Sequence, residues 1–240
     1  MEIARANAKL VVREDLADAF VHITEHGTVY DWAAKQPGAS QMQGRLPVYS
    51  VQLPFNGPEV VVRRNHHGGL LANLRGDRFL FARVPRELLV ARVLANSLGI
   101  PTADVIAQIS YRINALESRV DVVTLRLPPG EDLGAALMRA ASPEERERLW
   151  TAVDLLLAAL AERGVWHQDL NVKNVYLVTA DPPAPVLLDV DRVHFHHAGP
   201  LVGRANRDRL LRSLYKWRRT RGAVISDEEI ARVGTRPATP

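Results

Sequence analysis

The chain has 240 residues, no cysteine and a formal net charge of +4, and hydrophobic residues make up 47% of it. This length accommodates one large domain or two lobes with a buried core, and the lack of cysteine excludes disulfides, thiolate metal sites and cysteine nucleophiles. No apolar run approaches the roughly 18 residues that cross a bilayer, and no signal-peptide pattern opens the chain. We therefore expect a soluble, cytoplasmic protein.

The first 45 residues give weak secondary-structure patterns. Leu10 to Val12 and Phe20 to Ile23 have the composition of short strands. The segment from Asp15 to Phe20 and the residues around Trp32 are alternatives for a helical turn.

A β-hairpin is predicted next. Val48 to Leu53 and Val60 to Arg63 have strand composition, and the Asn56-Gly57 pair between them favours a tight turn. An antiparallel hairpin with a glycine just upstream is similar to the phosphate-covering loop of a kinase small lobe. Gly44 is therefore a candidate nucleotide-binding residue.

Two arginines, Arg63 and Arg64, end the second strand of this hairpin, where a protein kinase carries the lysine that contacts the nucleotide phosphates. A guanidinium can hold phosphate oxygens through two N–H groups, so Arg63 is a candidate nucleotide-binding residue; alternatively, both arginines are solvated. A helix is predicted over Pro85 to Leu98, and Glu87 flanks its buried stripe. Glu87 is therefore expected to pair with Arg63, as the kinase lysine pairs with glutamate, unless it is a surface residue.

Val105 to Ser110 and Val120 to Leu127 are two further strand candidates. The prolines and glycine of residues 128–130 then break the pattern. We interpret this break as a hinge between an N-terminal lobe of residues 1–127 and a C-terminal lobe of residues 128–240.

Polar residues end two strand-like apolar runs in the second lobe, after a long helix that a capping box starts at Ser142. Asn174 lies five residues after Asp169 in a His-x-Asp-x-x-x-x-Asn pattern, and Asp189 lies fifteen residues beyond Asn174. Phosphoryl transfer needs a carboxylate that orients the acceptor hydroxyl, and an amide oxygen and a second carboxylate on a metal ion. We predict Asp169 as the catalytic residue and Asn174 and Asp189 as metal ligands; the alternative is a coincidental polar loop. His167 is expected to brace the loop.

A basic segment follows these loops. Between Pro200 and Gly222 there are eight lysine and arginine residues against one acid, Asp208. Such a cluster suits nucleic acid, acidic lipid or a phosphorylated substrate, although a solvated face of a helix from Asn206 to Arg218 also explains it. The candidates for contacting a substrate or another anion are Arg64, His67, Arg207 and Arg212.

Taken together, these motifs resemble the lipopolysaccharide kinase (Kdo/WaaP-type) family, from about Gly44 to Trp217. The resembling segments are Val62 to Phe79, Arg83 with Glu87, His167 to Asn174, Leu188 to Arg192 and Asn206 to Leu214. Gln168 and Val190 replace residues that are common within two of these motifs, but neither position supplies a base or a metal ligand.

The resemblance implies an α+β, bilobal protein-kinase-like fold with an antiparallel-sheet N-lobe and a shortened, mostly helical C-lobe. It also implies a Mg-ATP-dependent kinase that phosphorylates the 4-hydroxyl of 3-deoxy-D-manno-octulosonic acid (Kdo) on lipid A, in lipopolysaccharide inner-core biosynthesis. The expected partners are Kdo-lipid A and the anionic surface of a Gram-negative inner membrane, at its cytoplasmic face. No nucleic acid partner is expected.

Two other functions stay open at this point. The acceptor could be a heptose of the lipopolysaccharide core or another small molecule, although a basic surface does not suit a cationic acceptor such as an aminoglycoside. A kinase-like fold could also bind its ligand without turnover, and the arginine in place of the strand lysine supports this alternative. The intact set of Asp169, Asn174 and Asp189 opposes it.

Overall fold

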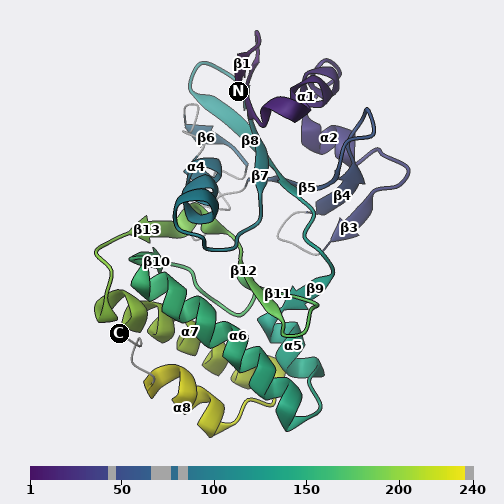
Figure 1. Ribbon diagram of the computed structural model, residues 1–240. Helices are drawn as coiled ribbons and strands as arrows, with labels where there is room; N and C mark the ends of the chain where they lie inside the picture. Colours follow the sequence, from purple (N-terminus) through teal and green to yellow (C-terminus); the bar gives the residue numbers. More distant parts are fainter. Residues whose placement is uncertain (43–46, 66–76, 81–85, 236–240) are drawn as a thin grey trace. The chain divides into compact units, whose positions relative to one another are not determined.

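The computed structural model describes residues 1–42, 47–65, 77–80 and 86–235 (Figure 1). The chain divides into two compact units, Met1–Leu89 with Asp104–Arg126, and Val90–Ala103 with Leu127–Pro240. The predicted hinge follows the division at Arg126 directly, whereas residues 90–103 group with the second unit. Two lobes that behave as separate domains stay a prediction.

An antiparallel sheet forms the first unit, and in the described residues its path runs β1-β2-β7-β8-β5-β4-β3, with β6 paired to β8. Its strands are β1 (Glu2–Ala4), β2 (Ala8–Val12), β3 (Ser40–Met42), β4 (Val48–Gln52), β5 (Glu59–Arg64), β6 (Phe79–Leu80), β7 (Val105–Arg112) and β8 (Glu117–Leu125). The predicted strands in this part of the chain are thus present, apart from the one at residues 20–23.

The hairpin of β4 and β5 confirms the turn predicted at Asn56-Gly57. The residues with left-handed backbone are Phe55, at φ 59°, and Asn56, at φ 56°, rather than the glycine. The Gly57 N–H donates to the Pro54 carbonyl at 3.1 Å and so closes the turn. The register then places Val62 opposite Tyr49 and leaves Arg63 and Arg64 at the end of β5.

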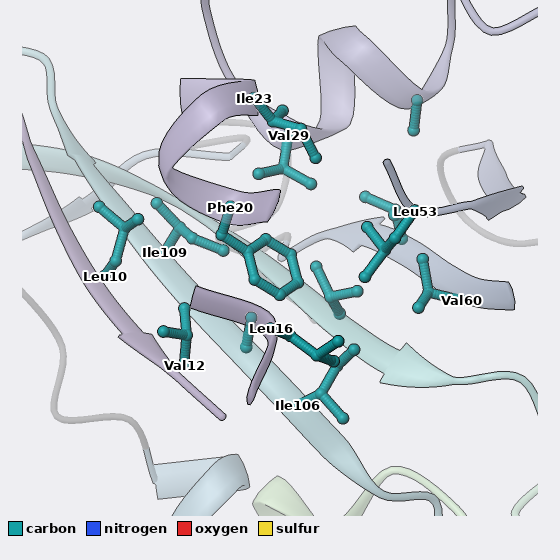
Figure 2. Packing of buried hydrophobic residues seen from close by; sticks show 14 of the residues in the cluster. Leu10, Val12, Leu16, Phe20, Ile23, Val29, Leu53, Val60, Ile106 and Ile109 are labelled. Carbon is teal, nitrogen blue, oxygen red and sulfur yellow. The ribbon is translucent and has the colours of Figure 1, made fainter. Parts of the chain in front are cut away.

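Short helices cover one face of this sheet, namely η1 (Glu14–Leu16), α1 (Ala17–Thr24) and α2 (Val29–Ala33). Phe20, Ile23 and Val29 pack with Leu10 and Ile109 of the sheet in the apolar core (Figure 2). The predicted strand at Phe20 to Ile23 is therefore wrong. Phe20 and Ile23 are both buried at a spacing of three, which fits a helix face, and their strand-like composition reflects burial.

The predicted helix over residues 85–98 is present in its described part. α4 (Arg86–Arg92) continues into a π-helical turn, η2 (Val93–Ser97). Gly99 follows with a left-handed φ of 61°, which suits a helix C-terminus. The first four residues of α4 belong to the first unit and the last three to the second.

The second unit contains the helices α5 (Leu133–Arg139), α6 (Pro143–Glu162), α7 (Pro200–Arg221) and α8 (Asp227–Thr235). The Ser142 hydroxyl accepts a hydrogen bond from the Glu145 N–H at 3.1 Å, which confirms the predicted cap of α6. α7 lies beside α6 and α8 (Figure 1). It begins six residues before the predicted start at Asn206, because Pro200 suits a first helical turn.

The described part of the second unit also contains five short strands: β9 (Gly130–Asp132), β10 (Val165–His167), β11 (Val175–Val178), β12 (Ala184–Leu187) and β13 (Val193–Phe195). They form a sheet of order β12-β11-β9 and a separate pair of β10 and β13. In the part of the chain that the structure describes, no helix has both the length and the apolar character needed to span a bilayer.

Candidate active site

Two loops of the second unit lie side by side, since each joins the same two strand pairs. Residues 168–174 connect β10 to β11, and residues 188–192 connect β12 to β13, while β10 pairs with β13 and β11 with β12. Main-chain hydrogen bonds join the loops directly, from the Gln168 N–H to the Arg192 carbonyl at 3.0 Å and from the Leu188 N–H to the Asn174 carbonyl at 2.9 Å. Strand pairing therefore brings the predicted catalytic and metal-binding segments together.

Asn174 is held by its amide nitrogen. Its Nδ2 donates to the main-chain carbonyl of Asp169 at 2.9 Å, and Asn171 Nδ2 donates to the same oxygen at 2.8 Å. The Asn174 side chain is buried, with 9% exposure. Because the nitrogen is engaged inside the loop, the amide oxygen is the atom that remains for a metal ion.

His167 is fully buried and forms hydrogen bonds with both loops. Its Nδ1 accepts a hydrogen bond from the Asp169 N–H at 3.1 Å, so the neutral ring carries its proton on Nε2, which donates to the Leu188 carbonyl at 3.0 Å. Burial lowers the pKa of His167 below its usual value, which favours this neutral form. The predicted bracing role of His167 agrees with these bonds.

Asp189 directly follows the residue that His167 holds. Its backbone is left-handed, with φ 56° and ψ 50°, a conformation that costs free energy for a residue other than glycine. Its side chain is exposed. The Asp189 carboxylate is thus accessible to solvent, and the residue before it, Leu188, is hydrogen-bonded to the Asn174 carbonyl.

The donor set suits a hard divalent cation. Within the described residues no three His, Cys, Asp or Glu side chains cluster as a metal site. The two predicted ligands, the Asn174 amide oxygen and the Asp189 carboxylate, are both oxygen donors. Mg²⁺ prefers oxygen ligands and is commonly held by one or two protein groups together with nucleotide phosphates. The residues present therefore fit Mg²⁺ bound with a nucleotide.

α7 supports the catalytic loop through three polar residues on one helical stripe, which the sequence analysis did not select. Asn206 Oδ1 accepts from the His167 N–H at 3.0 Å, and its Nδ2 donates to the Val165 carbonyl at 2.8 Å. Ser213 Oγ accepts from the Val172 N–H at 3.2 Å. Arg209 Nη2 donates to Asp169 Oδ1 at 2.5 Å. The spacing of three and four residues was visible in the sequence, but the loop that this stripe faces was not.

Arg207 faces a different part of the second unit. Its guanidinium is buried, lies 3.7 Å from Asp154 of α6 and donates to the Val233 carbonyl of α8 at 3.2 Å. A buried guanidinium engaged in this way holds helices together, so we remove Arg207 from the proposed anion-contacting residues. Arg212 is exposed on α7, and its contact with an anion stays a prediction.

In the first unit, the predicted pair of Arg63 and Glu87 is present. Arg63 Nη2 donates to Glu87 Oε1, and Arg63 Nη1 donates to Asn65 Oδ1 at 2.9 Å. Glu87 is buried, with 6% exposure, whereas the Arg63 side chain keeps 29%. The pair fixes one edge of the guanidinium, and contact with nucleotide phosphates stays a prediction.

Arg64, the next residue, has structural partners instead. Its Nε lies 3.1 Å from Asp121 Oδ1, its Nη2 donates to Thr28 Oγ1 at 2.8 Å, and its guanidinium stacks 4.4 Å from the centre of the Tyr30 ring. Burial raises the pKa of Asp121, and the charge of Arg64 opposes that rise. Arg64 is therefore also removed from the proposed anion-contacting residues. Gly44 and His67 lie outside the described residues.

An antiparallel sheet, a helical unit, and an Asp-Asn loop joined to a second Asp segment are the features expected of a kinase-like phosphotransferase. The sequence matches the Lipopolysaccharide kinase (Kdo/WaaP) family over residues 32–232, and the chain belongs to this family. Membership implies the use of ATP, typically with a divalent metal ion.

Curated relatives agree with this assignment. The chain is 25% identical over 205 residues to the 3-deoxy-D-manno-octulosonic acid kinase of Haemophilus influenzae (strain PittEE), covering 82% of this chain and 83% of the relative. It is 26% identical over 190 residues to the enzyme of the same name from Vibrio parahaemolyticus serotype O3:K6 (strain RIMD 2210633), covering 77% and 76%.

A solved structure, described as WaaP in complex with acyl carrier protein, shares the fold. It has a TM-score of 0.56 and 17% identity, with coverage of 95% of this chain and 90% of that one. The α+β kinase-like fold expected from the sequence is thus confirmed.

Proposed function

We propose that this lipopolysaccharide kinase transfers the γ-phosphate of Mg-ATP to the 4-hydroxyl of Kdo on lipid A. The observation that carries the proposal is that Asp169 and Asn174 lie on one loop of the second unit and Asp189 on another, and that the two loops are hydrogen-bonded to each other. The names of the curated relatives support Kdo as the acceptor.

Asp169 is the proposed base. Arg209 engages Asp169 Oδ1, so Oδ2 is the oxygen that would accept a hydrogen bond from the acceptor hydroxyl and then take its proton. Asn174 and Asp189 would hold Mg²⁺, which supplies charge neutralisation to the phosphates when it is bound. Arg63, steadied by Glu87, would contact nucleotide phosphates.

The outer face of α7 suits the anionic membrane surface where lipid A resides. Its exposed basic residues are Arg204, Arg212, Lys216, Arg218, Arg219 and Arg221. Tyr215 is 54% exposed and can lie at an interface. The Trp217 ring does not face such an interface, because it packs against Gly134 of α5. A Cβ added to Gly134 would lie 2.4 Å from this ring.

Mass spectrometry of Kdo-lipid A incubated with the protein, ATP and Mg²⁺ tests the proposal. We expect one added phosphate on the Kdo residue with the native protein and none with Asp169→Ala. Parallel incubations with heptosylated core and with kanamycin test the other acceptors. Phosphate found on a heptose but not on Kdo would replace the proposed acceptor, and phosphate on none of the three would refute the proposal.

A further inference from the structure

We propose that Arg209 recognises the carboxylate of an acid-sugar acceptor and thereby sets the specificity of the site. The inference rests on the proposed function, because it names the contact that would distinguish Kdo, which carries a carboxylate, from a neutral sugar such as a heptose.

Arg209 forms an ion pair with Asp169, the proposed base. Its Nη2 donates to Asp169 Oδ1 at 2.5 Å, a charge-assisted hydrogen bond. The Arg209 side chain is 36% exposed and that of Asp169 is 42% exposed. Both groups are therefore open to a ligand on the surface of the second unit.

The segment of α7 that carries Arg209 is held against the catalytic loop on both sides of this residue. Asn206, three residues earlier, bonds to the main chain of β10, and Ser213, four residues later, accepts from the Val172 N–H of the catalytic loop. Arg209 therefore stands at a defined place beside Asp169, as a specificity contact requires.

The hydrogen-bonding capacity of Arg209 is not used up. Among the described residues, its buried Nε–H has no acceptor. A guanidinium carries five N–H donors in a planar fork that matches a carboxylate through two parallel hydrogen bonds. A buried N–H without a partner is unfavourable. A rotation of the Arg209 side chain would let its guanidinium bind Asp169 and a ligand carboxylate together, and would give the Nε–H an acceptor. An arginine that only braced Asp169 would gain nothing from the additional donor.

The chemistry of the acceptor fits this arrangement. In an acid sugar such as Kdo, the carboxylate is attached to the same ring that carries the accepting hydroxyl. A sugar that donates its hydroxyl to Asp169 therefore brings its carboxylate close to the guanidinium that already touches Asp169. A neutral sugar in the same position gives Arg209 no anionic partner.

The test compares two acceptors, Kdo-lipid A and its Kdo carboxamide, in which a neutral amide replaces the carboxylate. The variants are Arg209→Gln, Arg209→Lys and the control Arg163→Gln, whose arginine is 37% exposed and paired with Glu162. kcat/KM is measured for each acceptor, together with ATP hydrolysis without acceptor.

We expect the native protein and the control to prefer the carboxylate by about 10- to 100-fold, the usual value of a charged hydrogen bond. Arg209→Gln should reduce this preference to about one, mainly through a higher KM for the carboxylate acceptor. Arg209→Lys should keep part of the preference, since it retains the charge but not the fork, and it carries the test if the glutamine variant does not fold.

Several results would overturn the inference. An equal loss for both acceptors would show that Arg209 only orients Asp169, and a parallel loss of ATP hydrolysis would place it on the phosphates. A native protein that phosphorylates both acceptors equally would refute this inference alone, whereas one that phosphorylates neither would refute the proposed function as well.

Discussion

Polar side chains are held differently at the end of β5 and in the two loops of the second unit. At β5, charge is matched with charge, since Arg63 pairs with Glu87 and Arg64 pairs with Asp121. In the second unit, the loops are held mainly by main-chain groups and by neutral side chains such as His167 and Asn206.

This difference predicts which substitutions lower the free energy of unfolding and which lower the catalytic rate. Removing one partner of a buried ion pair leaves an unpaired charge, which is costly. In contrast, Asp189 is exposed and its segment is held through the main chain, so its carboxylate can be replaced at little cost to folding. Substitution of Arg64 should therefore act on stability, and substitutions of the loop carboxylates should act on catalysis.

The largest effect is expected for Asp189→Asn, which removes the carboxylate and suits the left-handed backbone at this position. Loss of a charged metal ligand should lower kcat about 10²- to 10⁴-fold, because phosphoryl transfer depends on charge neutralisation, while the thermal midpoint should stay almost unchanged. Asp181→Ala, at an exposed loop residue, is the control and should keep full activity. A large fall in the midpoint without a change in kcat would reverse the assignment.

Arg64→Ala should lower stability rather than catalysis. It leaves the fully buried Asp121 without its cation, so we expect the free energy of unfolding to fall by about 3–5 kcal/mol at neutral pH. The loss should shrink as pH falls, because burial raises the pKa of Asp121 and its protonation removes the unpaired charge. Arg126→Ala, at the exposed pair with Glu59, should cost less than about 1 kcal/mol in the same urea titration. Equal losses at the two sites would contradict the comparison.

Asn206→Ala should have an intermediate effect. It leaves the buried His167 N–H and the Val165 carbonyl without their partner, which should cost about 1–3 kcal/mol for an unsatisfied group. Since β10 leads into the catalytic loop, kcat should fall as well. Ser213→Ala removes one half-buried acceptor and should cost less. Denaturant titration and steady-state kinetics of both variants check the order.

The smallest effect concerns His167 and pH. Burial lowers its pKa in the folded protein, so the stability it contributes is present above the unfolded pKa of about 6.5 and is lost as pH falls below it. The slope is at most about 1.4 kcal/mol per pH unit. Urea titrations between pH 7.5 and 5.5 should show a steeper loss for the native protein than for His167→Gln. Parallel curves would mean that His167 is not held neutral.

The sequence was sufficient to predict that the two loops follow short strands, because each motif is flanked by apolar residues. The pairing of these strands then aligns Asn174 with Leu188. The sequence was also sufficient for the cap at Ser142, which depends only on neighbouring residues. It misassigned Phe20 to Ile23, because strand-like composition also occurs on the buried face of a helix.

The contacts of α7 could not be predicted in the same way. The helical period shows that Asn206, Arg209 and Ser213 share a stripe, but a contact with a loop about 40 residues away depends on tertiary packing. Hence the sequence selected Arg207, which is buried against α6 and α8, instead of Arg209, which touches Asp169.

The most direct test of the central claim compares phosphate transfer and nucleotide binding in Asp169→Asn. If Asp169 is the base, single-turnover transfer from ATP to Kdo-lipid A should fall at least about 10²-fold, while the affinity for Mg-ATP stays within a few-fold of the native value. Unchanged transfer, or a loss explained entirely by weaker Mg-ATP binding, would contradict the account.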